Sequence, residues 1–390
     1  MQTKKTEDSH SSRRVAKRVE ELKPSGIRKF FDLIIGRDDI ISLGVGEPDF
    51  PVPWRIREEM IYSLEKGYTS YTSNYGLPEL RDGIAEYYRR FSLETSSKNV
   101  LITTGASEAI DLAIRAIIEP GDRVILPEPC YVSYRPLVSL CGGEIVSIPT
   151  NPDFKLNSEL IEKYVDEKTK AIILNYPANP TGVSYRKNEL EEIADSIIEH
   201  ELIVVSDEIY AELTFDYKHV AIASLNGMED RVITINGFSK AFSMTGMRVG
   251  YIIAPDDILA GILKIHQYCM LCAPITAQIG AIEALKCLEE VEKAKAEYLR
   301  RRNYLFKKLS EFLEIKKPEG TFYAFPNISS TGMGSEEFAE KLLFEKKVAV
   351  VPGNAFGECG EGYVRLAFAV KFEKLKEALD RMEEFVYAKG

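Results

Sequence analysis

The chain has 390 residues, of which 45% are hydrophobic and 28% charged, so it is long enough to bury a sizeable core in more than one domain. The formal net charge of −10 argues against a surface that binds nucleic acid or an anionic membrane, although it leaves room for a local basic pocket that holds a phosphate. The longest apolar stretches are far shorter than a membrane span of roughly 20 residues. The N-terminus is polar, and a cytoplasmic location is therefore expected.

Between residues 99 and 254, short β-branched runs alternate with longer helical patterns, which is typical of parallel βαβ units. The predicted strands are Val100–Thr103, Val124–Leu126, Glu144–Ile148, Ala171–Leu174, Leu202–Ser206, Val232–Ile235 and Val249–Ala254. The predicted helices between them are Ser107–Ile118, Leu160–Val165 and Asn188–His200. Most of the strands are apolar enough to be covered on both faces, which predicts an α/β fold with a mostly parallel sheet.

After Pro274 the pattern changes, and a second, smaller α+β domain is predicted. A long charged helix over Leu288–Phe312 is followed by strands at Thr321–Phe325, Val348–Val351 and Tyr363–Ala369 and by an amphipathic helix over Lys371–Ala388. We expect residues 46–290 to form the large domain. Residues 1–45 and 291–390 are expected to form the small one.

The six cysteines are scattered along the chain, which suits reduced thiols better than a disulfide framework. Cys269 and Cys272 have the spacing of a metal or redox site. No second Cys or His pair at ligand spacing accompanies them in the sequence, and the run Gln267–Ala273 is mostly apolar. We interpret both as ordinary buried residues, and no metal site is predicted.

In an open parallel sheet, ligands bind beyond the carboxyl ends of the strands. Polar or turn-forming residues follow four predicted strands, namely Thr104-Gly105-Ala106-Ser107, Asn175 to Gly182, Asp207 to Tyr210, and Asn236 to Lys240. These four strand ends should meet at one crevice. The small residues 105–107 stand where a helix begins, so their backbone N–H groups could cradle a phosphate, with a plain helix cap as the alternative.

Three motifs resemble, in order and spacing, the signatures of class I/II pyridoxal-phosphate-dependent aminotransferases of fold type I. They are Asn179-Pro-Thr-Gly182, Ser206-Asp207-Glu208-Ile209-Tyr210, and Ser239-Lys240 followed by Gly246-Met247-Arg248-Val249-Gly250. The likeness extends to Gly44–Asp49, Tyr71–Arg81, Gly320–Tyr323 and Tyr363–Leu366, and so covers nearly the whole chain. It implies the fold of that family, pyridoxal 5′-phosphate as cofactor, and transfer of an amino group between an amino acid and a 2-oxo acid.

The resemblance also assigns roles around the cofactor ring. Lys240 would hold the cofactor aldehyde as an imine and shuttle the substrate Cα proton, and Asp207 would keep the ring nitrogen protonated. Alone, Lys240 would be read as a surface charge and Asp207 as a turn former. Tyr210 and Asn179 resemble residues that bond the ring's phenolic oxygen, and Tyr131 resembles an aromatic that stacks on the ring, with packing as its alternative.

For the phosphate, the implied ligands are the amides of residues 105–107, the Ser239 hydroxyl and the Arg248 guanidinium, which suits bidentate contact. Tyr71 resembles a tyrosine that reaches the phosphate from the neighbouring subunit of a homodimer, although a packed aromatic is the alternative. Glu208 has no implied role and is expected to be solvated.

The substrate is expected to meet Arg365, which lies in an apolar strand where an unpaired cation is costly. The family clamps the substrate α-carboxylate with the matching arginine, and a structural ion pair is the alternative. Gly46 matches a backbone position that approaches the substrate. Tyr131 and Asn179 are also expected to contact it.

The substrate side chain is less defined. Dicarboxylate-specific relatives often carry a second basic residue, and one such lysine falls where this chain has Ser107. Arg28 is a possible substitute, although a solvated helix residue is the favoured alternative. The likeness also extends to aromatic-amino-acid and N-acetyl-diaminopimelate aminotransferases. We expect aspartate or an aromatic amino acid as donor, with glutamate and 2-oxoglutarate as the partner pair. The alternatives are an N-acetyl-diaminopimelate-type aminotransferase or a same-fold cysteine-conjugate β-lyase.

Overall fold

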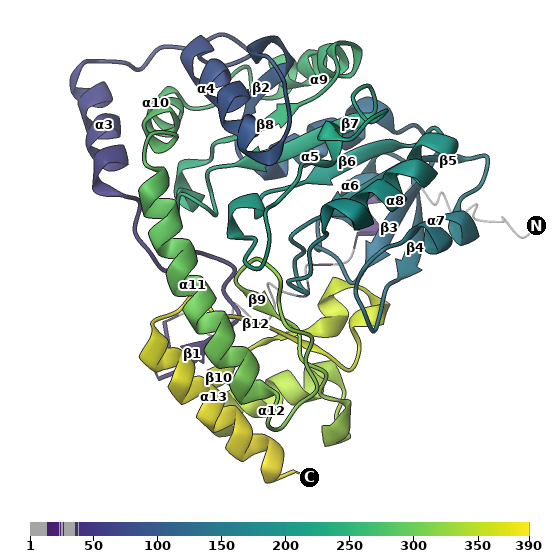
Figure 1. The fold of residues 1–390 in the computed structure, drawn as a ribbon, viewed down its shortest axis with the longest axis vertical. Helices are drawn as coiled ribbons and strands as arrows, with labels where there is room; N and C mark the ends of the chain where they lie inside the picture. The colour runs from purple at the N-terminus through teal and green to yellow at the C-terminus, as the bar shows by residue number, and fades with distance from the viewer. Residues whose placement is uncertain (1–13, 23, 25, 27–35, 38, 390) are drawn as a thin grey trace, which may run out of the picture.

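The computed structural model describes residues 14–22, 24, 26, 36–37 and 39–389. Its centre is a seven-stranded sheet in the order β2-β8-β7-β6-β5-β3-β4 (Figure 1). These strands are β2 (Val100–Thr103), β3 (Arg123–Glu128), β4 (Glu144–Pro149), β5 (Thr169–Asn175), β6 (Ile203–Asp207), β7 (Val232–Gly237) and β8 (Gly250–Ile253). Each overlaps a predicted strand, and the mostly parallel α/β sheet is confirmed.

Strand β8 is the exception to the parallel arrangement, because it runs antiparallel to both β2 and β7. The segment between β7 and β8 contains only the short 3₁₀ turn η5 (Thr245–Met247), with no crossover helix. A parallel return needs a longer crossover, so the chain returns antiparallel. The start of β8 therefore lies at the edge where its neighbours end. Arg248, two residues before β8, is carried to that edge.

Alternate residues of the strands face two separate layers of helices. On one face, Val205 and its equivalents pack against the first layer, formed by α5 (Ala106–Ile117), α6 (Tyr134–Leu140) and α9 (Asp256–Cys269). On the other face, Val204 and its equivalents pack against the second layer, which includes α4 (Pro78–Tyr88), α8 (Lys187–Glu199) and α10 (Ile275–Ala284). Burial of both faces explains why the strands are almost continuously apolar.

The smaller α+β domain lies beyond α11 (Leu288–Leu309), the long helix that descends from the large domain in Figure 1. It contains an antiparallel sheet in the order β11-β12-β9, formed by β9 (Tyr323–Ala324), β11 (Val351–Pro352) and β12 (Val364–Ala367), and the helices α12 (Ser335–Lys346) and α13 (Phe372–Tyr387). The single strand expected at 348–351 is divided, because β10 (Val348–Ala349) pairs instead with β1 (Ile41–Ser42). This pairing attaches β1 to the small domain.

Cys269 and Cys272, which were expected to be buried, lie at the end of α9 and just after it. Cys269 is exposed and Cys272 is half-buried, and the adjacent Tyr268 is 87% exposed. The helix already buries Leu259, Ile262 and His266 on its inner face, so its last turn projects outward. The interpretation of Cys269 as a core residue is therefore wrong. Within the described ranges, no cluster of His, Cys, Asp and Glu side chains is arranged to hold a metal ion.

No helix in the described part of the chain has both the length and the apolar character of a membrane span.

The first residue of β8 has no room for a side chain. A Cβ on Gly250 would lie 2.6 Å from the backbone nitrogen of Ala106 and 2.6 Å from the carbonyl carbon of Gly105. Neither backbone atom can move without displacing the start of α5. A Cβ on Gly246, four residues earlier, would meet nothing within 4 Å.

Gly250→Ala is therefore expected to reduce the free energy of unfolding by about 1–3 kcal/mol or more, because it overpacks a backbone contact. Gly246→Ala is the matched control and should stay within roughly 0.5 kcal/mol of the wild type. Calorimetric melting of the two purified variants makes the comparison. Equal melting temperatures for both would contradict the close approach of β8 to α5.

Candidate active site

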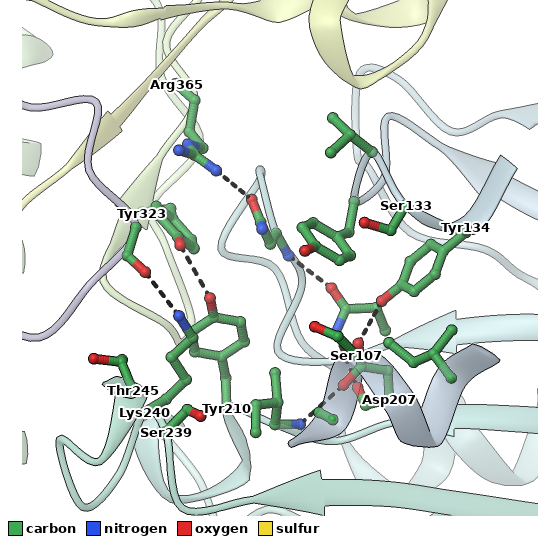
Figure 2. A pocket seen from close by; sticks show the side chains of 18 of the residues that line it. Ser107, Ser133, Tyr134, Asp207, Tyr210, Ser239, Lys240, Thr245, Tyr323 and Arg365 are labelled. Atoms are coloured by element: carbon green, nitrogen blue, oxygen red, sulfur yellow. Dashed lines mark hydrogen bonds between the residues drawn. The ribbon is translucent and has the colours of Figure 1, made fainter. Parts of the chain in front are cut away.

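A cavity of about 640 Å³ opens at the carboxyl edge of the large sheet (Figure 2). Its lining comes from strand ends of the large domain and from the small domain, and it comprises Gly46, Ala106, Ser107, Ile110, Tyr131, Val132, Ser133, Tyr134, Asn175, Asn179, Asp207, Ile209, Tyr210, Ser239, Lys240, Thr245, Arg248, Tyr323 and Arg365. The four strand ends predicted to converge do so here. The cavity is thus a boundary site to which both domains contribute.

Lys240 follows β7 and points into this cavity. Its Nζ donates a hydrogen bond to the Gly46 carbonyl at 2.7 Å, and no ion pair holds it among the described residues. Burial, together with the positive charges of Arg365 and Arg248, lowers the pKa of Lys240 to about 8. Near physiological pH, a larger fraction of this amine is therefore neutral and nucleophilic than of an ordinary lysine.

Asp207 ends β6 and is buried, with 4% of its surface exposed. Tyr134 donates its hydroxyl proton to Oδ2 at 2.6 Å, and the Ile209 backbone N–H donates to Oδ1 at 3.2 Å. Burial raises the pKa of Asp207 to about 6, although the hydrogen bond from Tyr134 acts against this rise. A buried carboxylate of this kind favours a cationic hydrogen-bond donor as its partner in the cavity.

Tyr210 and Tyr323 meet across the domain boundary. Their hydroxyl oxygens are 3.0 Å apart, and both side chains are almost fully buried. Burial raises the pKa of Tyr210 well above its usual value, so it stays a protonated donor at any physiological pH. The ring of Tyr210 lies beneath Lys240, with Nζ 5.9 Å from the ring centroid.

Arg365 comes from β12 and enters the cavity from the side of the small domain. Its Nη1 donates to Asn179 Oδ1 at 2.9 Å and its Nη2 donates to the Gly44 carbonyl at 2.8 Å. Its Nε is buried without a hydrogen-bond partner, and neither of its acceptors among the described residues is a carboxylate. A buried guanidinium held only by neutral groups is suited to a carboxylate ligand. The alternative of a structural ion pair is thus not observed.

Residues 105–107, where a phosphate cradle is predicted, lie at the start of α5. Gly105 precedes the helix with a φ of +84°, and a Cβ there would lie 2.5 Å from Nη2 of Arg248. Arg248 itself donates from Nη1 to the Thr245 carbonyl at 2.9 Å. Free helix N–H groups, a guanidinium and the nearby Ser239 hydroxyl form a donor set that suits a phosphate. The donor set therefore fits the phosphate of pyridoxal 5′-phosphate, and Lys240 fits its aldehyde.

Most of the residues predicted for the site line this cavity. Gly105 is not part of the lining, but it contacts Arg248 from behind. Tyr71 is 83% exposed and lies outside the cavity of its own chain, so a contact from a neighbouring subunit stays a prediction. Arg28 lies outside the described residues.

Glu208, which was expected to be solvated, is completely buried. Its carboxylate accepts hydrogen bonds from Ser206 Oγ at 2.9 Å and from the Tyr176 hydroxyl at 3.3 Å, and it lies 3.0 Å from Nε2 of His219. The alternation of side chains along the strand sends Asp207 to the cavity and Glu208 to the opposite side. The expectation is therefore wrong, because His219 folds back to cover Glu208.

Three contributors had no assigned role in the sequence. Tyr134 bonds Asp207, Tyr323 bonds Tyr210, and Asn175 connects two strand ends. The Nδ2 of Asn175 donates to the backbone carbonyl of Asp207 at 2.9 Å, and the Oδ1 of Asn175 accepts from the Asn179 N–H at 2.8 Å. The position of Asn175 at the end of a predicted strand was the available signal. The other two contacts arise only from tertiary packing.

Comparisons with known proteins agree with this geometry. The sequence pattern of the family "Aminotransferase class I and II" matches residues 38–382. A Bacillus subtilis (strain 168) aminotransferase, YugH, whose name gives no substrate, is 54% identical and covers 95% of this chain and 97% of its own length. An aspartate aminotransferase of Pyrococcus abyssi is 47% identical over 95% of this chain and 98% of its own. The crystal structure of an aromatic aminotransferase from Pyrococcus horikoshii OT3 has a TM-score of 0.88 and 44% identity, and covers 93% of this chain and 99% of that one.

Proposed function

The chain belongs to the class I and II aminotransferases, a family of pyridoxal-phosphate-dependent transaminases, and we propose that it transfers the amino group of aspartate or an aromatic amino acid to 2-oxoglutarate. The observation that carries this proposal is the pairing of two groups in one cavity. Lys240 offers an amine with a pKa of about 8, and Arg365 offers a buried guanidinium that lacks a carboxylate partner among the described residues.

Pyridoxal 5′-phosphate, when bound, supplies an aldehyde that takes up the amino group and a ring that stabilises negative charge at the substrate Cα. The residues that would hold it are those of the cradle and the ring pocket. Arg248, Ser239 and the amides of residues 105–107 would bind the phosphate. Asp207 would pair with the protonated ring nitrogen, and Tyr210 would donate to the ring oxygen.

Lys240 is the group that would move the proton at the substrate Cα. Its side chain is held near Gly46 by the hydrogen bond to the carbonyl of that residue, on the side of the cavity that faces Tyr210. A base works best when its pKa lies close to the working pH, and a pKa of about 8 meets that condition. Arg365 would hold the substrate α-carboxylate by two hydrogen bonds and so fix the Cα–H bond in place.

The residues that line the cavity also indicate which amino acid could donate the amino group. Of the described lining residues, the cations are Lys240, Arg248 and Arg365, and each has a task already. Ile110, Tyr131 and Val132 add apolar surface that suits an aromatic side chain. The names of the relatives support both donors, since one is an aspartate and one an aromatic aminotransferase.

A half-reaction screen tests the proposal. Purified protein loaded with pyridoxal 5′-phosphate is mixed with aspartate, glutamate, phenylalanine, tyrosine or tryptophan, and the cofactor absorbance is recorded. Aspartate or an aromatic donor should bleach the long-wavelength band, and 2-oxoglutarate should restore it. An unchanged spectrum with all of these donors would contradict the proposal. Release of pyruvate and ammonia from a cysteine conjugate without an oxo acid would indicate a β-lyase instead.

Lys240→Ala provides the internal test of the mechanism. Loss of a covalent, proton-transferring residue should reduce turnover by about 10⁴-fold or more, by analogy with other residues that act as a catalytic unit. Lys168→Ala, an exposed lysine near the opposite edge of the sheet, is the matched control and should turn over normally. Normal turnover by Lys240→Ala would rule out its assigned role.

We also propose that the protein is a homodimer in which Tyr71 reaches the partner's cavity. The helix α3 (Trp54–Glu65) exposes Trp54, Ile61, Tyr62 and Leu64, and the segment after it exposes Tyr68 and Tyr71. The last turn of α9 and the residues that follow it expose Tyr268, Met270 and Leu271. Asn74 Nδ2 donates to the Leu271 carbonyl at 2.7 Å and so ties these two segments together. An exposed apolar surface of this kind is typical of a subunit interface.

Light scattering should give the mass of two chains. Tyr71→Ala and Lys240→Ala, each of low activity alone, should recover roughly a quarter of wild-type activity when unfolded together and refolded, because half of the dimers are then hybrids with one intact site. A monomeric mass, or no recovery in a mixture that forms dimers, would contradict the assignment of Tyr71.

A further inference from the structure

Tyr323 lies at the centre of the site without a role in the proposed reaction. It belongs to β9 of the small domain and is 1% exposed. Its hydroxyl lies 3.0 Å from the hydroxyl of Tyr210, and its ring lies beneath the guanidinium of Arg365, with Cζ 4.4 Å from the ring centroid. One side chain therefore touches both the ring-oxygen donor and the carboxylate clamp, as Figure 2 shows.

The hydroxyl contact fixes the direction of a proton. Each tyrosine has one hydroxyl proton, and the two hydroxyls are each other's hydrogen-bond partner among the described residues. When Tyr210 turns its proton toward an acceptor in the cavity, Tyr323 is left to donate to the oxygen of Tyr210. A hydrogen bond received at that oxygen makes Tyr210 a stronger donor, because hydrogen bonds in a chain polarise one another.

The ring contact acts on a different group. Among the described residues, Arg365 donates hydrogen bonds to two neutral acceptors, and its Nε has no hydrogen-bond partner. The face of the Tyr323 ring supplies a cation–π contact that keeps the guanidinium plane in position before a carboxylate binds. A phenylalanine would preserve this contact, whereas an aliphatic side chain would remove it.

The position of Tyr323 also depends on Gly46. A Cβ on Gly46 would lie 2.3 Å from the Tyr323 hydroxyl oxygen, so the backbone of Gly46 passes directly beside it. The same residue accepts the hydrogen bond of Lys240 through its carbonyl oxygen, at 2.7 Å. Tyr323 is thus packed against the segment that orients the amine.

We propose that Tyr323 is a positioning residue with two separable functions: its hydroxyl sets the donor strength of Tyr210, and its ring holds Arg365 ready for the substrate carboxylate. This inference rests on the proposed transaminase function. It predicts that the two functions can be removed one at a time, because they reside in different parts of one side chain.

Tyr323→Phe removes the hydroxyl and keeps the ring. With the weakened Tyr210 donor, the pH titration of the bound cofactor's visible absorbance should move to higher pH by about half a unit to one unit, the size expected for one hydrogen bond. The KM for the amino acid donor should change less than about twofold, because the Arg365 contact persists.

Tyr323→Leu removes both parts. The absorbance titration should move as in Tyr323→Phe, and in addition the KM should rise about 3- to 30-fold, the range of a partly buried cation–π contact. Tyr304→Phe, a ring contact to Phe372 in the small domain at 5.1 Å, is the matched control and should behave as the wild type in both measurements.

An unchanged absorbance titration in Tyr323→Phe would overturn the assignment of the hydroxyl, and an unchanged KM in Tyr323→Leu would overturn that of the ring. Equal KM increases in both variants would also overturn the proposal, because the functions would then not be separable. Failure of the proposed function is distinguished beforehand, since wild-type protein would then show no cofactor absorbance that responds to an amino acid.

Discussion

Unpaired positive charge in a partly closed cavity is the constraint on which the site depends. Among the described residues, Lys240, Arg248 and Arg365 face the cavity without a carboxylate partner, and Asp207 is the buried anion opposite them. Keeping cations out of water without counter-ions is unfavourable, and the pKa of Lys240 falls to about 8 for that reason. A ligand that brings a phosphate and a carboxylate would supply the missing charges. These charges would therefore favour binding of the phosphate and the carboxylate whatever the substrate side chain is.

The topology concentrates these groups at one edge. Asp207 and Lys240 follow parallel strands, and their side chains meet because those strands end together. Arg248 joins them only because β8 runs in the opposite direction and begins where its neighbours end. The small domain closes the site from the other side, where β9 and β12 pair directly and present Tyr323 and Arg365. The proposed carboxylate clamp and the proposed phosphate cradle thus come from different domains, so the substrate carboxylate and the cofactor phosphate would be held from opposite sides of the cavity.

The sequence predicts which residues carry the chemistry of the site better than it predicts the side chains that contact them. Strand ends can be located from apolar runs, so Asp207 and Lys240 could be placed at one edge without knowing the packing. The antiparallel direction of β8 could not be predicted, because the apolar run of a strand does not indicate which way the strand runs. Glu208 was misread because its partner His219 lies in an irregular segment eleven residues later, and no periodic pattern indicates that it folds back. The hydroxyl contacts of Tyr134 and Tyr323 depend on side chains from distant elements and have no local signal.

Burial of Lys240, together with the positive charges of Arg365 and Arg248, lowers the pKa of its amine, and titration of Lys240 in cofactor-free protein tests this most directly. The rate at which an amine-selective reagent modifies Lys240, followed by peptide mass spectrometry across a pH series, reports the fraction of neutral amine. The structure predicts half-maximal reactivity at a pH of about 8, with reactivity rising as the pH increases through that value. A midpoint near 10.5, the value of an ordinary lysine, would contradict the account.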